Sequence, residues 1–580
     1  MELFLLVRNG SDLRPKFFSR VREEFFGSDS VTRDGGNYTL YLNRKTLASS
    51  CSLCTGSYGS AYGTGTFVYR MGGPEESLLL LLNDFTEGRF DQASLLGHYF
   101  IFLFLPSGIK ILSDGTGLVK AFHDTEGSYL SSSFLLAARL HSDLTLNRAA
   151  ATENLVTGGI TGTETLVNEI SSFSKGSFTL FPEIGFVLPR PGTTADKPAT
   201  ESDAIRRQAE LLGNYFSSCR KLAESGGADI GLTGGYDSRL VLACARDHIH
   251  DLRIHSHYRP AGSEEWRIAR TITEGEGISF TSPEVTPPEK MDDGMLLRVI
   301  GNSFMFSDGA ISLHCNWMEE YNTLEYRLSV LGNKRLGFSG IGGEQYRNQE
   351  RLYGKPWLFS QWLKYSYLRK VSGRVFLTVK DEREMQAGIK SKICSITGFS
   401  PGKRFISLAD LKRIQNEVII PAYRGARTDA ENRHSWYLSP LADFHVSRAA
   451  YGIIKFLKDS KRFEADLIRV ISPSLATYPT DYGYDLVRGE PLSGRLFSSA
   501  FENLLPASLK WAVREKLKTR GRVGPLSEKI RTSQLLSGYV QNVSSAGLPV
   551  SVPALLKRES TAHMVVALGY FLEKLEIAAE

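Results

Sequence analysis

Residues 231–240 read GLTGGYDSRL, where two adjacent glycines separate an apolar run from a helix-like segment. The apolar run, ADIGL at 228–232, has the length of a buried strand, and SRLVLACARD at 238–247 has helical spacing. A second helical pattern at 203–224 and a second strand-like run at 252–258 flank this unit. Alternation of helix and strand predicts a parallel sheet with helices on its faces.

The glycine pair has a defined use between a strand and a helix. Loops that follow the strands of a parallel sheet lie at the ligand-binding edge, and the first turn of a helix offers free N–H groups to an anion. Gly234 and Gly235 let the backbone approach a phosphate and permit a strained turn. Thr233 and Ser238 add hydroxyl donors. Asp237 would repel a phosphate unless a magnesium ion lies between them, so the stretch predicts a phosphate loop with magnesium.

In this context TGGYDS resembles the pyrophosphate-binding loop of the ATP-pyrophosphatase (PP-loop) superfamily, whose usual form is Ser-Gly-Gly-x-Asp-Ser. A tight Gly-Gly turn with an ordinary surface aspartate is the alternative. SGIGGEQYRN at 339–348 resembles the Ser-Gly-x-Gly-x-Asp-Glu loop of the asparagine synthetase family within that superfamily. The resemblance implies that Glu344 holds magnesium together with Asp237, and that Gly340 and Gly342 contribute to nucleotide binding.

Other stretches bear the family resemblance less closely. AGSEEWRIAR at 261–270 resembles an Asp-Glu segment of the family, although Glu264 and Glu265 could equally form a solvated helix start. Asp308 resembles the acidic turn that lines the family's acceptor pocket. YLSPLADFHVSRAA at 437–450 resembles a packing element of the family.

The resemblance also implies a lysine that neutralises charge on the activated intermediate. Lys458 and Lys461 are the two candidates, and either could instead be an exposed helix residue. Gln345 stands where the family has a second acid, so one acidic contact is missing. Asp237, Glu344 and one of these lysines form the expected catalytic set.

Residues 1–190 show short β-rich runs separated by Gly, Ser and Asn, which predicts packed sheet layers. They resemble the glutaminase domain of the same family, an Ntn-hydrolase-like β sandwich. That domain uses a cysteine at position 2, where this chain has Glu2. Without the thiol we expect no acyl-enzyme route from glutamine and a structural role for the domain. The departure points to relatives that use another amine, such as β-lactam synthetases and lasso-peptide macrolactam synthetases.

The linker PRPGTTADKPATESD at 189–203 is rich in Pro, Thr and charge, and it indicates a domain boundary. We expect an ATP-binding, doubly wound parallel-sheet domain at 200–490 and a helical C-terminal region at 491–580. Helical patterns prevail from about residue 405. The expected fold is therefore α/β combined with α+β.

These motifs predict an ATP-dependent, AMP-forming amide ligase that uses ATP and Mg²⁺. A small-molecule or peptide carboxylate would attack the α-phosphorus of ATP, pyrophosphate would leave, and an amine would displace AMP. Natural-product biosynthesis, of antibiotics or peptide macrolactams, is the expected setting. Amidation of a sugar uronate or amino acid derivative with external ammonia is one alternative, and a catalytically reduced scaffold is another.

Composition limits the partners and the compartment. A net charge of +6 over 580 residues is too small for a dedicated nucleic-acid binder, and the basic stretch 509–524 with Trp511 fits a solvated helix better than a tRNA surface. No apolar run reaches the roughly 18–20 residues of a membrane span, and no secretory signal is recognisable, so we expect a cytoplasmic protein. Cys51 and Cys54 lack the further ligands of a zinc site. A homodimer is compatible with this composition.

Overall fold

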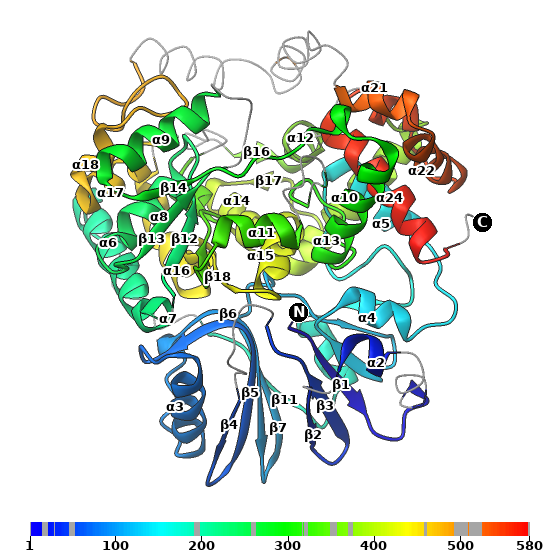
Figure 1. Ribbon diagram of the computed structural model, residues 1–580, viewed down its shortest axis with the longest axis horizontal. Coiled ribbons are helices and arrows are strands. Elements are labelled where there is room, and N and C mark those ends of the chain that lie inside the picture. The colour runs from blue at the N-terminus through cyan, green and yellow to red at the C-terminus, as the bar shows by residue number, and fades with distance from the viewer. Residues whose placement is uncertain are drawn as a thin grey trace.

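The computed structural model shows a mixed α/β protein with several sheets, one of them parallel, and many helices (Figure 1). It describes residues 2–13, 15, 21–27, 30–45, 53–190, 198–224, 226–256, 263–315, 317, 323–348, 356–368, 375–457, 461–491, 509 and 525–577. Cys51, Lys458, the centre of the linker at 191–197 and the basic stretch from 510 to 524 lie outside the described residues, so the predictions made for them stay predictions.

The first 190 residues form two β-sheets that pack face to face. The first has the strand order β10-β8-β9-β1-β3-β2, and the second has β11-β7-β6-β5-β4. Their strands are β1 (Phe4–Arg8), β2 (Val31–Asp34), β3 (Tyr38–Leu42), β4 (Leu53–Gly56), β5 (Gly59–Tyr69), β6 (Leu95–Leu105), β7 (Gly108–Ser113), β8 (Phe122–His123), β9 (Tyr129–Ser131), β10 (Ser171–Ser172) and β11 (Gly185–Val187). The sheet layers expected for this part of the chain are confirmed.

Strand β6 separates two hydrophobic cores because its side chains alternate between the two faces of the sheet. Phe102 and Phe104 face the first sheet, where the ring of Phe4 lies with its centroid 4.9 Å from that of Phe102. Leu103, between them in sequence, faces the other way into the core beneath helix α3 (Pro74–Thr86). The apolar run of β6 is therefore continuous because alternate side chains fill two different cores.

The second part of the chain contains a five-stranded, fully parallel sheet of order β14-β13-β12-β15-β18. Its strands are β12 (Ala228–Gly231), β13 (Leu252–His255), β14 (Ser279–Thr281), β15 (Leu336–Phe338) and β18 (Trp436–Leu438). The chain first runs outward from β12 to β14 and then places β15 and β18 on the opposite side of β12. The strand order therefore reverses between β12 and β15, and open α/β sheets bind ligands at such a point. The predicted parallel sheet is confirmed.

Helices cover this sheet, as the alternating sequence pattern predicted. Helices α6 (Glu201–Ser218), α8 (Asp237–Ala245) and α17 (Arg462–Ile471) pack together and share a hydrophobic core with the strands. Residues 240–245 of α8 are apolar on every side and all buried, as expected for a helix that lies inside a protein.

The helical remainder of the chain packs against the N-terminal sheets. The main helices are α13 (Val379–Thr397), α14 (Leu408–Ile414), the π-helical η8 (Gln415–Arg424), α15 (Gly425–Asn432), α21 (Pro525–Thr532), α22 (Gln534–Ser545) and α24 (Glu559–Lys574). Phe571 of α24 stacks on Phe134 with ring centroids 5.8 Å apart, and one hydrophobic core contains residues from both regions. Within the described ranges, no helix combines the length and the apolar character needed to cross a membrane.

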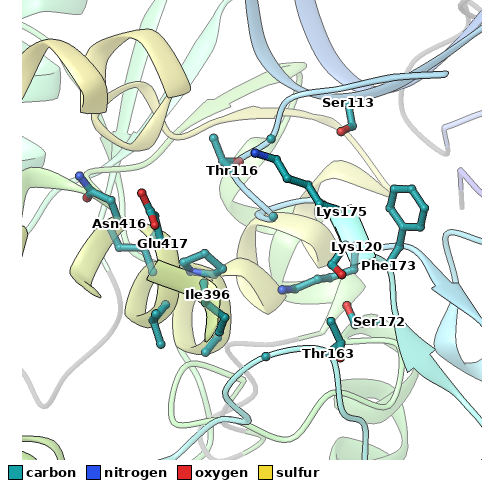
Figure 2. Close-up of a pocket in the computed structure, with 18 of the residues that line it drawn as sticks. Ser113, Thr116, Lys120, Thr163, Ser172, Phe173, Lys175, Ile396, Asn416 and Glu417 are labelled. Carbon is teal, nitrogen blue, oxygen red and sulfur yellow. The ribbon is translucent and has the colours of Figure 1, made fainter. Parts of the chain in front are cut away.

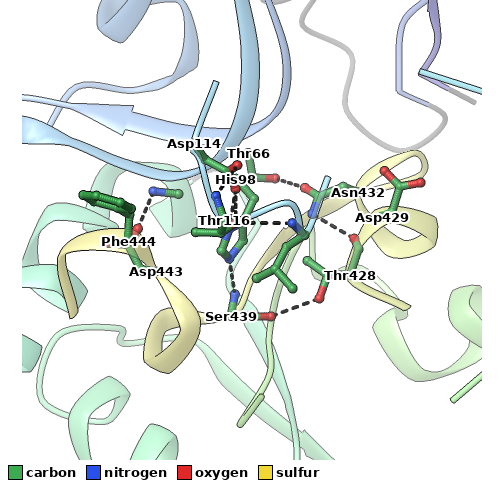
Figure 3. Close-up of polar contacts among 12 residues, drawn as sticks. Thr66, His98, Asp114, Thr116, Thr428, Asp429, Asn432, Ser439, Asp443 and Phe444 are labelled. Atoms are coloured by element: carbon green, nitrogen blue, oxygen red, sulfur yellow. Dashed lines mark hydrogen bonds and ion pairs between the residues drawn. The ribbon is translucent and has the colours of Figure 1, made fainter. Parts of the chain in front are cut away.

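A polar seam joins the second N-terminal sheet to the loop that follows β18 (Figure 3). Ser439 N–H donates to His98 Nε2 over 3.2 Å, and Gly97 N–H donates to Asp443 Oδ2 over 2.9 Å. Because Nε2 of His98 accepts a hydrogen bond, its Nδ1 carries the proton that faces Asp114 Oδ2 at 3.0 Å. The seam therefore fixes both the loop and the tautomer of this buried histidine.

Candidate functional site

The two glycine-rich stretches leave neighbouring strands at the same edge of the parallel sheet. The first stretch follows β12 and leads into α8, and the second follows β15 and leads into a 3-10 turn, η5 (Gly343–Tyr346). The strands pair directly, with Ile230 opposite Phe338. Both loops therefore flank the point where the strand order reverses. The structure brings together two motifs that lie about a hundred residues apart in the sequence.

Two glycines of the second loop are required, Gly340 by its contact with the first loop and Gly342 by its contact with the loop after β18. A Cβ atom on Gly340 would lie 2.8 Å from the backbone nitrogen of Ser238. Gly342 has a φ of +100°, and a Cβ atom there would lie 2.6 Å from the carbonyl carbon of Leu441. Neither position accepts a side chain without movement of the backbone. The contact places Gly340 directly over the start of α8, which begins at Asp237.

Hydroxyl groups hold the first loop in shape. Thr233 N–H donates to Ser238 Oγ over 3.1 Å, and Gly235 N–H donates to Thr233 Oγ1 over 3.3 Å. Neither Gly234 nor Gly235 has a positive φ, so the expected strained turn is wrong for both of these residues. Gly234 is needed for another reason, because its Cβ would lie 2.9 Å from the Cβ of Asp481.

Each of the two predicted magnesium ligands contacts an arginine. Asp237 forms an ion pair with Arg347, whose Nε also donates to Glu464 Oε2 over 2.5 Å. Glu344 Oε1 lies 2.7 Å from Nη2 of Arg424. Burial raises the pKa of Glu464, and the adjacent guanidinium opposes that rise. The carboxylates of Asp237 and Glu344 are therefore each paired with a guanidinium group in this structure.

The residues fit a magnesium ion that is shared with a nucleotide. Mg²⁺ is normally held by one or two carboxylates together with phosphate oxygens and water. Glu344 Oε2 is buried and has no hydrogen-bond partner among the described residues, and the side chain of Asp237 is 27% exposed. In the described part of the chain, no group of three or more His, Cys, Asp or Glu is placed to hold a metal. A divalent ion here would need nucleotide phosphates as further ligands.

Lys461 lies beside the first loop, whereas Lys458 falls outside the described residues. The amine of Lys461 lies over the ring of Tyr482 and 5.3 Å from the ring centroid of Tyr236. Burial, and next the positive charge of Arg347, lowers the pKa of Lys461 to about 8. The amine is therefore still mostly charged at neutral pH and can attract a phosphate. Of the two lysine candidates, the structure describes only this one.

A segment that the sequence analysis missed forms one wall of the first loop. Asp481 N–H donates to Gly234 O over 3.2 Å. Arg239, buried in α8, holds the preceding residues by donating to the carbonyl of Tyr478 over 2.8 Å. Burial lowers the pKa of Arg239 to about 10. No spacing in the sequence links this segment to the glycine pair, since only the fold brings them together.

Gln345, where the family has an acid, serves to pack the second loop. Its side chain is 1% exposed, and Nε2 donates to the carbonyl of Leu441. The predicted packing element at 437–450 contains that carbonyl, in the short helix η9 (Pro440–Ala442). The loop after β18 therefore packs against the second glycine loop and supports it.

The structure also places two other acids that the sequence resemblance singled out, Asp308 and Glu264. Asp308 accepts from Ser133 Oγ over 2.6 Å and lies 3.0 Å from Arg433, at the start of helix α4 (Phe134–Arg139). Asp308 also lines a cavity of about 120 Å³, and the acceptor-pocket role that the sequence resemblance implied stays a prediction. Glu264 is exposed in the first turn of α9 (Glu264–Glu276), as the solvated alternative requires.

Position 2 holds a buried ion pair. Glu2 lies 2.8 Å from the amine of Lys45 and also accepts from Gly65 N–H over 2.8 Å. The backbone N–H of Glu2 donates to Arg433 O over 2.7 Å. Burial raises the pKa of Glu2 and lowers that of Lys45. All of these contacts are with groups of the protein itself, and the structural role expected for this domain stays a prediction.

A comparison of the sequence with protein-family models and with curated proteins found no match, so the functional assignment depends on the site described above.

Proposed function

We propose that this protein is an ATP-dependent, AMP-forming amide ligase that joins a carboxylate to an amine. The observation that carries the proposal is the contact between the two glycine loops at the reversal point of a parallel sheet, seen where Gly340 meets Ser238. Asp237 and Glu344 stand on the two loops, and Lys461 lies beside the first. Hydrogen-bond donors, acids and an amine converge there, as the binding of a nucleoside triphosphate requires.

In the proposed reaction the loops bind and orient ATP. Free N–H groups at the start of α8 and the hydroxyls of Thr233 and Ser238 hold the pyrophosphate oxygens. Asp237 and Glu344 would hold Mg²⁺, which supplies charge neutralisation on the phosphates when bound. The substrate carboxylate attacks the α-phosphorus and pyrophosphate leaves, with Lys461 placed to stabilise the negative charge. An amine then displaces AMP and forms the amide.

The amine is proposed to come from a source other than glutamine. A glutaminase of this type needs a nucleophile at position 2, and Glu2 there is held by Lys45 and by the Gly65 N–H group. The ligase would therefore take an amine from solution, or one carried by the same substrate as the carboxylate. When the substrate carries both groups, amide formation closes a ring within it.

Calorimetric titration with ATP and magnesium tests the proposal. We expect saturable binding to the natural protein and much weaker binding to Asp237→Ala, while Glu274→Gln, which removes a surface acid of α9, binds normally. ATP–pyrophosphate exchange with a panel of amino acids and uronates then reports adenylation without the amine. Release of AMP, and not ADP, completes the assignment.

A nucleotide-free scaffold is the second candidate, and the arginine pairs favour it. Arg347 and Arg424 already neutralise the two acids that would hold magnesium. A scaffold predicts no ATP binding by the natural protein or by Asp237→Ala. It also predicts no exchange with any acid in the panel.

A further inference from the structure

A cavity of about 810 Å³ lies between the N-terminal sheets and the helical region (Figure 2). The sheet side contributes residues that follow β7, β10 and β11, and the helical side contributes α13, η8 and the start of α16 (Phe444–Ala449). Its volume falls in the range of small-molecule sites, and such sites occur preferentially where two structural units meet. None of the residues assigned above to the nucleotide lines this cavity.

An apolar layer separates the cavity from the glycine loops. Leu118, Ile420 and Ala442 form a small hydrophobic cluster, and Ile341 of the second glycine loop packs against it. Ile420 and Ala442 also line the cavity. A ligand in the cavity would therefore be a neighbour of the nucleotide but would not share its binding groups.

The acidic side chains on the cavity wall already have cationic or hydrogen-bonding partners. These pairs are Glu417 with Arg413 at 3.2 Å and Arg448 at 3.0 Å, Glu164 with Lys392 at 2.5 Å, and Asp114 with His98 at 3.0 Å and Thr116 Oγ1 at 2.5 Å. No acid of the wall is thus left to neutralise a further cation among the described residues.

Two lysines of the same wall remain. Lys120 and Lys175 come from the sheet side, and their amines extend towards the side that carries Glu417 and Ile396 (Figure 2). Neither amine makes a hydrogen bond or an ion pair with any described residue. Burial lowers the pKa of Lys120, which the charge of Asp429 opposes. Lys120 is partly buried, and an amine withdrawn from water without a partner is costly, so an anion would relieve that cost. Lys175 is exposed and adds a second positive charge.

The remaining wall offers neutral polar groups, both donors and an acceptor, and an aromatic face. Thr163 and Ser172 lie near Lys120, and Phe173 lies on the same side (Figure 2). Asn416 Oδ1 is buried without a hydrogen-bond partner among the described residues and lies on the opposite wall. Hydroxyl and amide groups of this kind orient a polar ligand, while the lysines supply its charge complement.

We propose that this cavity binds a small organic anion, with the carboxylate or phosphate oxygens of the ligand held by Lys120 and Lys175. The ligand is an organic acid or a phosphorylated metabolite of a size that the cavity encloses. This site goes beyond the proposed ligase function and does not depend on it, because its lysines and hydroxyls belong to a different surface of the protein.

Calorimetric titration of the full-length protein with citrate, with glucose 6-phosphate and with uncharged sorbitol tests the proposal. We expect saturable binding of at least one of the two anions and none of sorbitol. Lys120→Met and Lys175→Met should each weaken that binding about tenfold, because each removes a charge-assisted hydrogen bond. Lys380→Met, at a side chain 82% exposed on α13, is the matched control and should bind normally.

Lysine footprinting of the unsubstituted protein tests the site without depending on the folding of any variant. Lysines are reductively methylated with and without the anion and quantified by peptide mass spectrometry, and the anion should protect Lys120 and Lys175 but not Lys380. Binding of citrate alone identifies a carboxylate site, and binding of glucose 6-phosphate alone identifies a phosphate site.

Three results would overturn the site. They are the absence of saturable binding by either anion, unchanged affinity in both cavity variants, and loss of anion binding in Asp237→Asn. The last result would place the anion at the glycine loops. Because Asp237→Asn should otherwise leave anion binding intact, failure of the ligase proposal and failure of this site give different results.

Discussion

Two carboxylate–cation pairs, Glu2 with Lys45 and Asp237 with Arg347, lie where the family resemblance leads us to expect chemistry. The side chains of Glu2 and Lys45 are 8% and 2% exposed, whereas that of Asp237 is 27% exposed. Glu2 also accepts a backbone N–H, so its partners are all internal. An enclosed pair holds the fold together, while a pair with an open side can exchange its partner for a ligand. Burial therefore separates the structural acid from the proposed catalytic one.

Breaking the enclosed pair should have the largest effect. Lys45→Met leaves the Glu2 carboxylate buried without its cation, and we expect a loss of about 3–5 kcal/mol in the free energy of unfolding. Urea denaturation followed by circular dichroism measures this loss. The double variant Glu2→Gln, Lys45→Met removes both charges and should recover most of the stability. A loss below about 1 kcal/mol for Lys45→Met would show that the pair is not enclosed as described.

The open pair should respond in the opposite way. Asp237→Asn removes a proposed magnesium ligand, and we expect Mg·ATP affinity to fall about a hundredfold, which corresponds to about 2.7 kcal/mol. The free energy of unfolding should change by less than about 1 kcal/mol, because Asp237 is partly exposed. Calorimetry and urea denaturation on the same preparation compare the two quantities. Equal affinity in both proteins would remove the proposed role of Asp237.

The contact between the glycine loops can be tested with a matched pair of alanines. Gly340→Ala places a methyl group against the Ser238 backbone and should cost about 1–3 kcal/mol of stability and weaken Mg·ATP binding. Gly235→Ala has more room, because its nearest foreign atom is Thr233 Oγ1 at 3.5 Å, and should cost less than about 1 kcal/mol. Similar losses in both variants would argue against close contact of the loops.

The smallest predicted effect concerns pH. Lys461 has a pKa of about 8, below that of an ordinary lysine, so its amine is charged below that pH and loses its charge as the pH rises through it. We expect Mg·ATP affinity to fall by up to about tenfold between pH 7 and pH 9. Lys461→Arg should keep its affinity over this range, and Lys461→Met should be weak throughout. If all three proteins showed the same pH profile, Lys461 would be excluded as the cause of the pH dependence of Mg·ATP affinity.

Much of the fold was predictable because local patterns determine it. The spaced β-rich runs of residues 1–190 and the helix–strand order around β12 led to the N-terminal sheet layers and to the parallel sheet. The shared core of α24 and the N-terminal sheets was not predictable, because the apolar face of a helix does not name the surface that covers it. The seam at His98 was hidden for the same reason, since each of its residues is unremarkable in the sequence.

The candidate site shows a similar division. Thr233 was predicted from the glycine pair that follows a strand, and Gly340 from the family resemblance of the second loop. Parallel strands bring such strand ends together. Arg347 and Arg424 were missed, although both contact predicted metal ligands. Charged residues on surface-like stretches carry no signal of their partners, so only the three-dimensional contacts identify them. The contact of Asp308 with Ser133 was also missed, because a short acidic turn matches many contexts.

A chain that lacked the N-terminal sheets would also lose a support of the second glycine loop. The loop after β18 is held by His98 and Gly97 on one side, and it receives Gln345 of the second glycine loop on the other. A change at position 2 leaves these contacts in place, whereas deletion of the domain removes them. The first domain is therefore needed by the second whatever stands at position 2.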